Sequence, residues 1–426
     1  MYLDSRNKTE CFGCEGCMQA CCVNAISMVE DDEGFRYPEI DTEKCINCGY
    51  CRRVCPYSNI PAKDEGNKYV FGGYNKESEI RFNSTSGGAF SAIVDTFCDD
   101  NYVIFGAEAK GILVFHSYVT DKKEVGKYRK SKYSQSAMGH SYRDVRRFLE
   151  DGKKVLFSGT PCQIAGLISF LGKTDRKNLL TVEVVCEGVP SLLYVRKMEK
   201  DIEERYGDRI ELLDYRYTGK GLFPNGYLRG DKISPKIRGG ICGKWDFQQM
   251  RIVLKNKKKI IIKDRWFNPF WSVWLQHLMS RPSCYKCPFT TTERVADITL
   301  GDLWGVHLYC PELYGNNCGA SLVVCNTEKG KMVFKKAQTQ MYGHELRLED
   351  ALKYQGPMRK SISENDNRDA FMVDLKSDVS FKKINEKWAK RPSAKLLFQK
   401  YIWGNRQKVF VWNLTHRKNK EKHIKC

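Results

Sequence analysis

Two cysteine-rich stretches near the start of the chain decide its fold: residues 11–21 read C-F-G-C-E-G-C-M-Q-A-C, and residues 45–56 read C-I-N-C-G-Y-C-R-R-V-C-P. Each has the spacing Cys-x2-Cys-x2-Cys-x3-Cys, and a proline follows the second. Bacterial ferredoxins with two [4Fe-4S] clusters use this spacing, because three close thiolates bind one cluster and the fourth binds the other. The predicted ligands are Cys11, Cys14, Cys17 and Cys55 for one cluster, and Cys45, Cys48, Cys51 and Cys21 for the other.

Two other uses of these cysteines fit the spacing less well. Zinc sites usually combine two separated Cys-x2-Cys pairs. Disulfide frameworks belong to small secreted domains, and we expect no signal peptide here. One position stays open: Cys22 stands where a proline often follows the fourth cysteine, so Cys22 is the alternative to Cys21.

The composition predicts a folded, cytoplasmic protein of more than one domain. The chain has 426 residues, and 42% of them are hydrophobic, which is enough for a large core and too many for a disordered chain. No apolar run reaches the length of a transmembrane segment. The 19 cysteines suit a reducing compartment if many bind metal or stay free.

The charge is unevenly distributed along the chain. Residues 1–60 carry 6 Lys and Arg against 10 Asp and Glu, whereas the whole chain has 71 against 51. An acidic module thus joins a basic body, which predicts an anionic substrate, cofactor or redox partner, with an unpartnered solvated surface as the alternative. No nucleic-acid-binding motif accompanies the charge. The basic tail from residue 401 onward would permit peripheral contact with a membrane.

Apolar patterns and turn residues divide the chain into three parts. Residues 1–60 form the ferredoxin module, whose two cysteine quartets flank a predicted hairpin, so its fold is expected to be α+β and ferredoxin-like. Residues 61–68 read as a linker. Over residues 69–330, short apolar strands alternate with helices, which predicts an α/β domain with a mainly parallel sheet. Residues 331–426 are predicted to form a helical, basic extension.

Two loops of the α/β region are candidates for binding. The loop N-S-T-S-G-G at residues 83–88 opens a helix, where free backbone N–H groups suit a phosphate. An ordinary strand-to-helix turn is the commoner explanation of so short a motif. The basic and aromatic stretch at residues 127–136 either covers a flavin or nucleotide or is a surface loop.

Four more cysteines are candidates for a third metal centre. Cys162 and Cys186 each follow a predicted strand, at the edge where open α/β sheets bind ligands. With the pair Cys284 and Cys287 they would suffice for another [4Fe-4S] cluster, while a zinc site or inert buried thiols are the alternatives. Six other cysteines have no such context and are expected to be buried or free thiols: Cys98, Cys242, Cys310, Cys318, Cys325 and Cys426.

Several longer motifs resemble one protein family. They are S-T-S-G-G-A-F (84–90), K-S-K-Y-S-Q-S (130–136), V-L-F-S-G-T-P-C-Q-I-A-G-L (155–167), C-E-G-V-P-S (186–191), R-P-S-C-Y-K-C-P-F (281–289) and R-V-A-D-I-T-L-G-D-L-W-G (294–305). The chain is similar to the beta subunits of coenzyme F-420 hydrogenases and dehydrogenases, in the form fused to an N-terminal 2[4Fe-4S] ferredoxin domain. In detail it resembles bacterial members found among polysaccharide-biosynthesis proteins.

The resemblance implies an iron–sulfur flavoprotein oxidoreductase. In that family, electrons pass between [4Fe-4S] clusters and FAD, and a soluble carrier or substrate is reduced or oxidised; here it would be deazaflavin-like, nicotinamide or sugar-linked. The resemblance favours a third cluster at Cys162, Cys186, Cys284 and Cys287. It implies flavin-phosphate contacts at Ser86, Gly87 and Gly88, and flavin or substrate contacts at Lys132, Tyr133, Gln135 and Ser136. Glu187 departs from the family, whose members often have histidine there.

Two other functions stay open on the sequence. A non-catalytic electron-transfer subunit of a larger complex would need a separate catalytic protein as its redox partner. A structural iron–sulfur protein would instead use its basic face to bind an anion or glycan.

Overall fold

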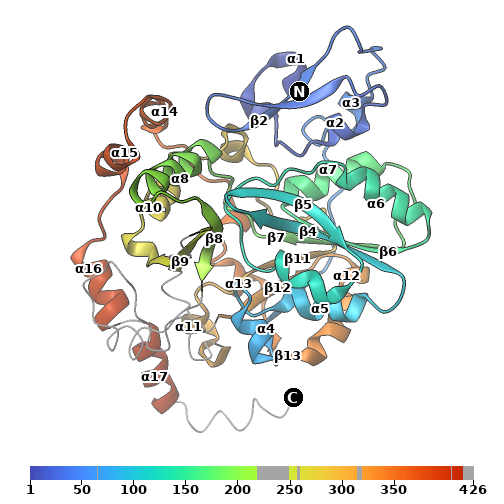
Figure 1. Cartoon of the computed structure of the whole chain (residues 1–426). Helices are drawn as coiled ribbons and strands as arrows, with labels where there is room; N and C mark the ends of the chain where they lie inside the picture. Colours follow the sequence, from blue (N-terminus) through green and yellow to red (C-terminus); the bar gives the residue numbers. More distant parts are fainter. Residues whose placement is uncertain (65, 218–248, 257–259, 314–318, 404, 416–426) are drawn as a thin grey trace.

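The N-terminal module has the predicted α+β fold. The computed structural model describes the whole chain apart from residues 65, 218–248, 257–259, 314–318, 404 and 416–426. In the module, β1 (Ile26–Glu30) and β2 (Arg36–Ile40) pair antiparallel, which confirms the predicted hairpin. The short helices are α1 (Tyr2–Ser5), η1 (Lys8–Glu10), α2 (Gly16–Ala20) and α3 (Tyr50–Arg53). Figure 1 shows the module at one end of the molecule, next to α7.

An eight-stranded sheet forms the centre of the second domain, in the order β13-β3-β12-β11-β7-β6-β4-β5. The strands are β3 (Tyr69–Asn75), β4 (Tyr102–Lys110), β5 (Leu113–Val119), β6 (Lys154–Gly159), β7 (Leu179–Val184), β11 (Ile298–Asp302), β12 (Ser321–Cys325) and β13 (Met341–Glu345). The four strands β4, β6, β7 and β11 are parallel, and the remaining pairs are antiparallel. The predicted α/β class is confirmed, but the sheet is mixed. At one edge β5 follows β4 through a tight turn, which permits only antiparallel pairing.

Helices cover both faces of this sheet. They include α5 (Ala89–Phe97), α6 (Ser141–Glu150), α7 (Pro161–Leu171) and α12 (Glu328–Ala337). Because successive side chains of a strand point to opposite faces, Ile104 packs in a cluster with α5 and α12, whereas Val103 and Phe105 pack in one with α6 and α7. The alternation buries both faces and leaves the strand ends for the site.

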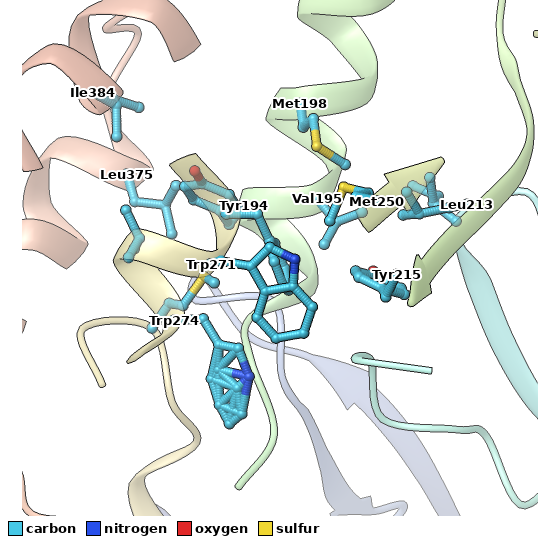
Figure 2. Packing of buried hydrophobic residues seen from close by; sticks show 14 of the residues in the cluster. Tyr194, Val195, Met198, Leu213, Tyr215, Met250, Trp271, Trp274, Leu375 and Ile384 are labelled. Atoms are coloured by element: carbon cyan, nitrogen blue, oxygen red, sulfur yellow. The ribbon is translucent and has the colours of Figure 1, made fainter. Parts of the chain in front are cut away.

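A smaller subdomain packs beside the main sheet. Its antiparallel sheet consists of β8 (Ile210–Tyr217), β9 (Gln249–Leu254) and β10 (Ile260–Lys263). Its helices are α8 (Leu192–Tyr206), α10 (Pro269–Leu275), α14 (Arg368–Lys376) and α15 (Phe381–Trp388). Figure 2 shows their shared core, in which Tyr194 of α8, Trp271 of α10 and Leu375 of α14 lie together. The C-terminal helices therefore belong partly to this core.

The main domain extends beyond the boundary expected at residue 330. Helix α12 spans that position, and β13 pairs with β3 at the edge of the main sheet. The remaining elements are η2 (Lys122–Tyr128), α4 (Ser78–Phe82), η5 (Arg265–Phe267), η6 (Pro282–Lys286), α11 (Val306–Tyr309), η8 (Gln338–Gln340), α13 (Leu348–Leu352), η9 (Gly356–Met358), α16 (Ala394–Leu397), η10 (Phe398–Ile402) and α17 (Asn405–Thr415). None of the described helices is long and apolar enough to cross a bilayer. The predicted basic tail lies largely in residues 416–426, outside the described residues.

Candidate functional site

The ferredoxin cysteines approach one another in the groups that the spacing predicts. Burial, and next the nearby thiols of Cys17, Cys55 and Cys11, raise the pKa of Cys14. For Cys51, burial raises the pKa, and the neighbouring thiols are those of Cys48 and Cys45. The fold thus brings together the four thiols of the first group and, in the second, those of Cys45, Cys48 and Cys51.

The geometry around Cys21 favours this residue over Cys22 as the fourth ligand. The Cys21 side chain is half-buried, and its Sγ accepts the backbone N–H of Ala25 at 3.2 Å. Cys22 is exposed to solvent. An N–H directed at sulfur stabilises a thiolate, as it does around iron–sulfur clusters, so Cys21 remains the predicted ligand.

The third group of cysteines lines one small cavity of about 40 Å³. Cys162 lies in the first turn of α7, after a capping box in which Thr160 and Gln163 bond each other's backbone. Cys186 follows β7, and Cys284 and Cys287 lie in and just after η6. Burial raises the pKa of Cys186, and the other three thiols raise it further. Four converging thiols fit a [4Fe-4S] cluster or zinc.

The module is packed directly on the helix that carries Cys162. At Gly166 of α7, a Cβ atom would lie 2.9 Å from Cβ of Cys14 and 2.9 Å from the Tyr142 hydroxyl. Phe12 lines the small cavity and packs edge-on against Phe289, with ring centroids 5.4 Å apart. The Cys11 group therefore lies beside the third group, and its Cys17 also lies near Cys51 of the other ferredoxin group.

Arg281 joins the two domains, a role that its place in the sequence did not predict. Its side chain is fully buried, and it donates to the carbonyl of Cys11 at 2.9 Å, Oε1 of Gln135 at 3.0 Å and the carbonyl of Arg36 at 3.0 Å. In the part of the chain that the structure describes, it forms no ion pair with a carboxylate. The sequence could have pointed to this residue, because Arg281 begins the motif R-P-S-C-Y-K-C.

A larger cavity of about 570 Å³ opens at the carboxyl ends of β6, β7 and β11. Its size is typical of a cofactor site, and it shares residues 186–189 with the small cavity. Its wall carries more basic than acidic side chains, which favours an anionic ligand. The charged side chains are Arg129, Lys130, Lys132, Arg216, Arg265, Glu187 and Asp302.

Two of the three predicted phosphate contacts line this cavity. Gly88, with φ +81°, precedes the first turn of α5, and Ser86 donates its hydroxyl to Asp302. Gly87 does not line the cavity: its N–H donates to Oγ of Ser321 at 2.9 Å, and a Cβ there would lie 2.3 Å from the Gly73 carbonyl oxygen. Gly87 therefore serves packing against the sheet, because its amide is already bonded.

The four candidates at 132–136 have different surroundings. Nζ of Lys132 donates to the carbonyls of Lys127 and Arg129, and burial lowers the pKa of this lysine to about 8. The Tyr133 ring packs edge-on against Trp271, with centroids 4.8 Å apart. Both residues line the large cavity.

Gln135 and Ser136 are engaged in structural contacts. Nε2 of Gln135 donates to the carbonyl of Phe12 at 2.8 Å, so this side chain holds the ferredoxin module. Oγ of Ser136 lies 2.8 Å from Nδ1 of His116. Both residues line the cavity, but their polar groups already have partners within the protein.

His116 is a cavity residue that the sequence did not reveal. Its Nε2 lies 2.9 Å from the carbonyl of Ser158, and burial lowers its pKa to about 4, so the ring is neutral at pH 7. The carbonyl requires a proton on Nε2, so Nδ1 accepts from Ser136. A single histidine in an apolar strand gives no signal of its place, and its position emerges only from the pairing of β5 beside β4.

Two protein-family models match the chain. Residues 152–350 match the C terminus of the coenzyme F420 hydrogenase/dehydrogenase beta subunit, and residues 10–59 match a 4Fe-4S dicluster domain. Residues 152–350 are therefore similar to the C-terminal part of these beta subunits. The two matched regions contain all twelve predicted cluster ligands. The dicluster match identifies an iron–sulfur protein, and residues 152–350 are similar to part of a redox protein.

Two further likenesses are weaker. An uncharacterized polyferredoxin-like protein of Methanocaldococcus jannaschii is 33% identical over 75 residues, which cover 14% of this chain and 45% of that protein. The chain therefore spans less than half of this relative. The F420-reducing [NiFe] hydrogenase complex from Methanosarcina barkeri, solved as a xenon derivative, superposes with a TM-score of 0.42 and 14% identity over 77% of this chain and 95% of the other. A likeness of this degree supports no functional conclusion.

Proposed function

We propose that the chain is an iron–sulfur flavoprotein oxidoreductase, in which electrons pass between two ferredoxin clusters, a third [4Fe-4S] cluster and FAD. One observation carries the proposal: Cys186 lines both the small cavity of the third cysteine group and the large cavity at the sheet edge. A cluster held by Cys186 would therefore adjoin the cofactor in the large cavity. Such adjacency is what electron transfer between the two requires.

The large cavity has the features that FAD needs. Gly88 and the following amides of α5 supply N–H donors for a phosphate. Arg129 and Lys132 add positive charge, and Trp271 and Trp274 supply an aromatic wall. Bound FAD would supply the exchange between one-electron and two-electron chemistry.

The burial of the cysteines indicates the order of the clusters along the electron path. Cys48 is exposed, whereas Cys14 is buried against α7. The Cys45 group would therefore meet an external carrier or redox protein, and the Cys11 group would connect it to the third cluster. The substrate would reach FAD through the open side of the large cavity. Its class would be deazaflavin-like, nicotinamide or sugar-linked.

Anaerobic purification with iron, sulfide and flavin analysis tests the proposal. Three clusters and the flavin would give about twelve irons per chain and about one FAD. Replacing Cys284 and Cys287 with serine should remove about four irons and leave the ferredoxin clusters in place. The buried Cys325 of β12 lines neither cavity, so Cys325→Ser is the matched control.

The outcomes separate the alternatives. About eight irons with no flavin would contradict the third cluster and the FAD site, while leaving the ferredoxin module intact. Bound FAD without turnover of any carrier would instead favour a subunit that transfers electrons to a separate catalytic protein. Clusters that cannot be reduced would favour a structural role.

A further inference from the structure

Three side chains capable of binding a metal meet away from both cavities. Sγ of Cys310 lies 3.1 Å from Nε2 of His344 and 3.3 Å from Oε1 of Glu312, and the same nitrogen and oxygen are 3.3 Å apart. None of the three residues lines the large or the small cavity. This group is therefore separate from the proposed electron path.

The three atoms form a nearly equilateral triangle. In a tetrahedral zinc site, bonds of about 2.3 Å to sulfur and about 2.0–2.1 Å to nitrogen and oxygen place the ligand atoms about 3.3–3.6 Å apart. The observed separations of 3.1–3.3 Å lie close to this range.

The same geometry argues against a nucleophilic triad. In such a triad the carboxylate bonds the histidine nitrogen opposite to the one that faces the nucleophile. Here Glu312 and Cys310 both face Nε2 of His344. Convergence on one nitrogen is the arrangement of ligands around a shared centre.

Two separate elements hold the triangle in place. Cys310 directly follows α11 as its C-cap, and Glu312 comes two residues later, so both lie on one short segment of chain. His344 lies on β13, where a Cβ at the neighbouring Gly343 would lie 2.1 Å from the carbonyl oxygen of Gly72. The close approach of β13 to β3 thereby fixes the position of His344.

We propose that Cys310, Glu312 and His344 bind a zinc-class divalent ion. A thiolate with an imidazole and a carboxylate selects zinc over magnesium or calcium, which prefer oxygen ligands alone. The Glu312 and His344 side chains are 37% and 45% exposed, so an ion and a water as fourth ligand have access. Binding releases the Cys310 proton and ties α11 to the edge strand.

The test is zinc analysis of the full-length chain, purified anaerobically with its clusters. Wild type should carry or take up about one zinc per chain. His344→Gln and Glu312→Gln alter partly exposed side chains and should each weaken zinc binding at least about tenfold, measured by competition with a chromophoric chelator. Cys325→Ser, which changes another buried thiol, should bind zinc like wild type.

Iron and sulfide contents distinguish this site from the cluster cysteines. They should be the same in wild type and in both variants, and X-ray absorption at the zinc edge should show one sulfur ligand. Failure of the wild type to bind zinc would overturn the proposal. So would zinc binding that both variants retain, or zinc that enters only as cluster iron is lost.

Discussion

Arg281 carries a buried positive charge that no carboxylate of the described residues neutralises, so another group must serve as its counterion. Removing an ion from water costs several kcal/mol unless an opposite charge compensates it. Burial lowers the pKa of Arg281, but the negative charges of Cys11, Tyr37 and Cys284 raise it above its usual value. Cys11 and Cys284 belong to two different cysteine groups. We therefore expect the two anionic clusters at these groups to be its electrostatic partners.

Arg281→Gln is expected to lower the reduction potentials of those two clusters. A nearby positive charge stabilises the reduced, more negative cluster, so its loss favours the oxidised state. The shift should be on the order of 50 mV, close to a tenfold change for a one-electron couple. Redox titration followed by EPR measures it. Arg281→Lys, which keeps the charge, should shift less, and equal shifts in both variants would contradict the electrostatic role.

Because Lys132 lines the large cavity, we expect the affinity of this cavity for an anion to depend on pH. Burial lowers its pKa to about 8, so the lysine is charged below that pH and loses its charge above it. The affinity for FAD should therefore fall as the pH rises through 8, which fluorescence titration of the flavin can follow. Lys132→Arg should keep its affinity up to pH 9, because an arginine stays protonated. An unchanged profile in that variant would show that another group titrates.

At the scale of elements, α7 positions the module through one close contact. Gly166→Val would drive a side chain into Cys14 and the Tyr142 hydroxyl, each of which has an atom 2.9 Å from the place that a Cβ would take. We expect a loss of about 1–3 kcal/mol of stability and faster release of iron from the Cys11 cluster to a chelator. Gly126→Ala is the control, since nothing lies within 4 Å of its Cβ position. Equal iron release in both variants would refute the contact.

The helices and strands also show how much of the fold could be predicted from the sequence. Local spacing sufficed for the cysteine quartets and the hairpin, because each depends on neighbours in the chain. The strands of the main sheet followed from apolar runs, but their direction did not: β12 reads as a buried strand, and nothing in its residues reveals that it runs antiparallel to β11. Helix α8 and strand β9 were not predicted; the charged face of α8 obscures its apolar pattern.

The residues of the cavities divide in the same way, into those that a local motif identifies and those that only tertiary contacts bring together. Ser86 and Gly88 of the quoted motif line the large cavity, whereas Gly87 in the same motif packs on β3. His116 and Arg281 act through contacts with segments 20 or more residues away. Cys310 and His344 are 34 residues apart with no shared periodicity. Only the tertiary fold brings such residues together.

For the whole molecule, part of the charge asymmetry is resolved within the chain. The acidic turn of the module faces basic residues of the body: Glu33 pairs with Arg368 at 2.6 Å, Asp32 with Lys376 at 2.8 Å, and Glu30 with Arg196. Arg368 and Lys376 belong to α14, so the C-terminal helices hold the module in place. The sequence predicted an anionic partner for the basic body, and the chain's own acidic turn meets part of that positive charge.

These pairs differ in burial, and the difference predicts how the module is held. The Glu33 and Arg368 side chains are 12% and 7% exposed, so Glu33→Gln removes the nearest carboxylate from a buried guanidinium, which keeps only Asp369 at 3.8 Å as a counterion among the described residues. That change should cost about 3–5 kcal/mol. Asp32 is 60% exposed, and Asp32→Asn should cost less than about 1 kcal/mol, because solvent screens the pair.

Hydrogen exchange across β1 and β2 measures both effects. Glu33→Gln should speed exchange in the hairpin strongly, and Asp32→Asn should leave it nearly unchanged. Raising the salt concentration should affect the exposed pair more than the buried one. If both variants behaved alike, the module would be held by its apolar contacts and by Arg281, and the buried ion pair would contribute little to the position of the clusters.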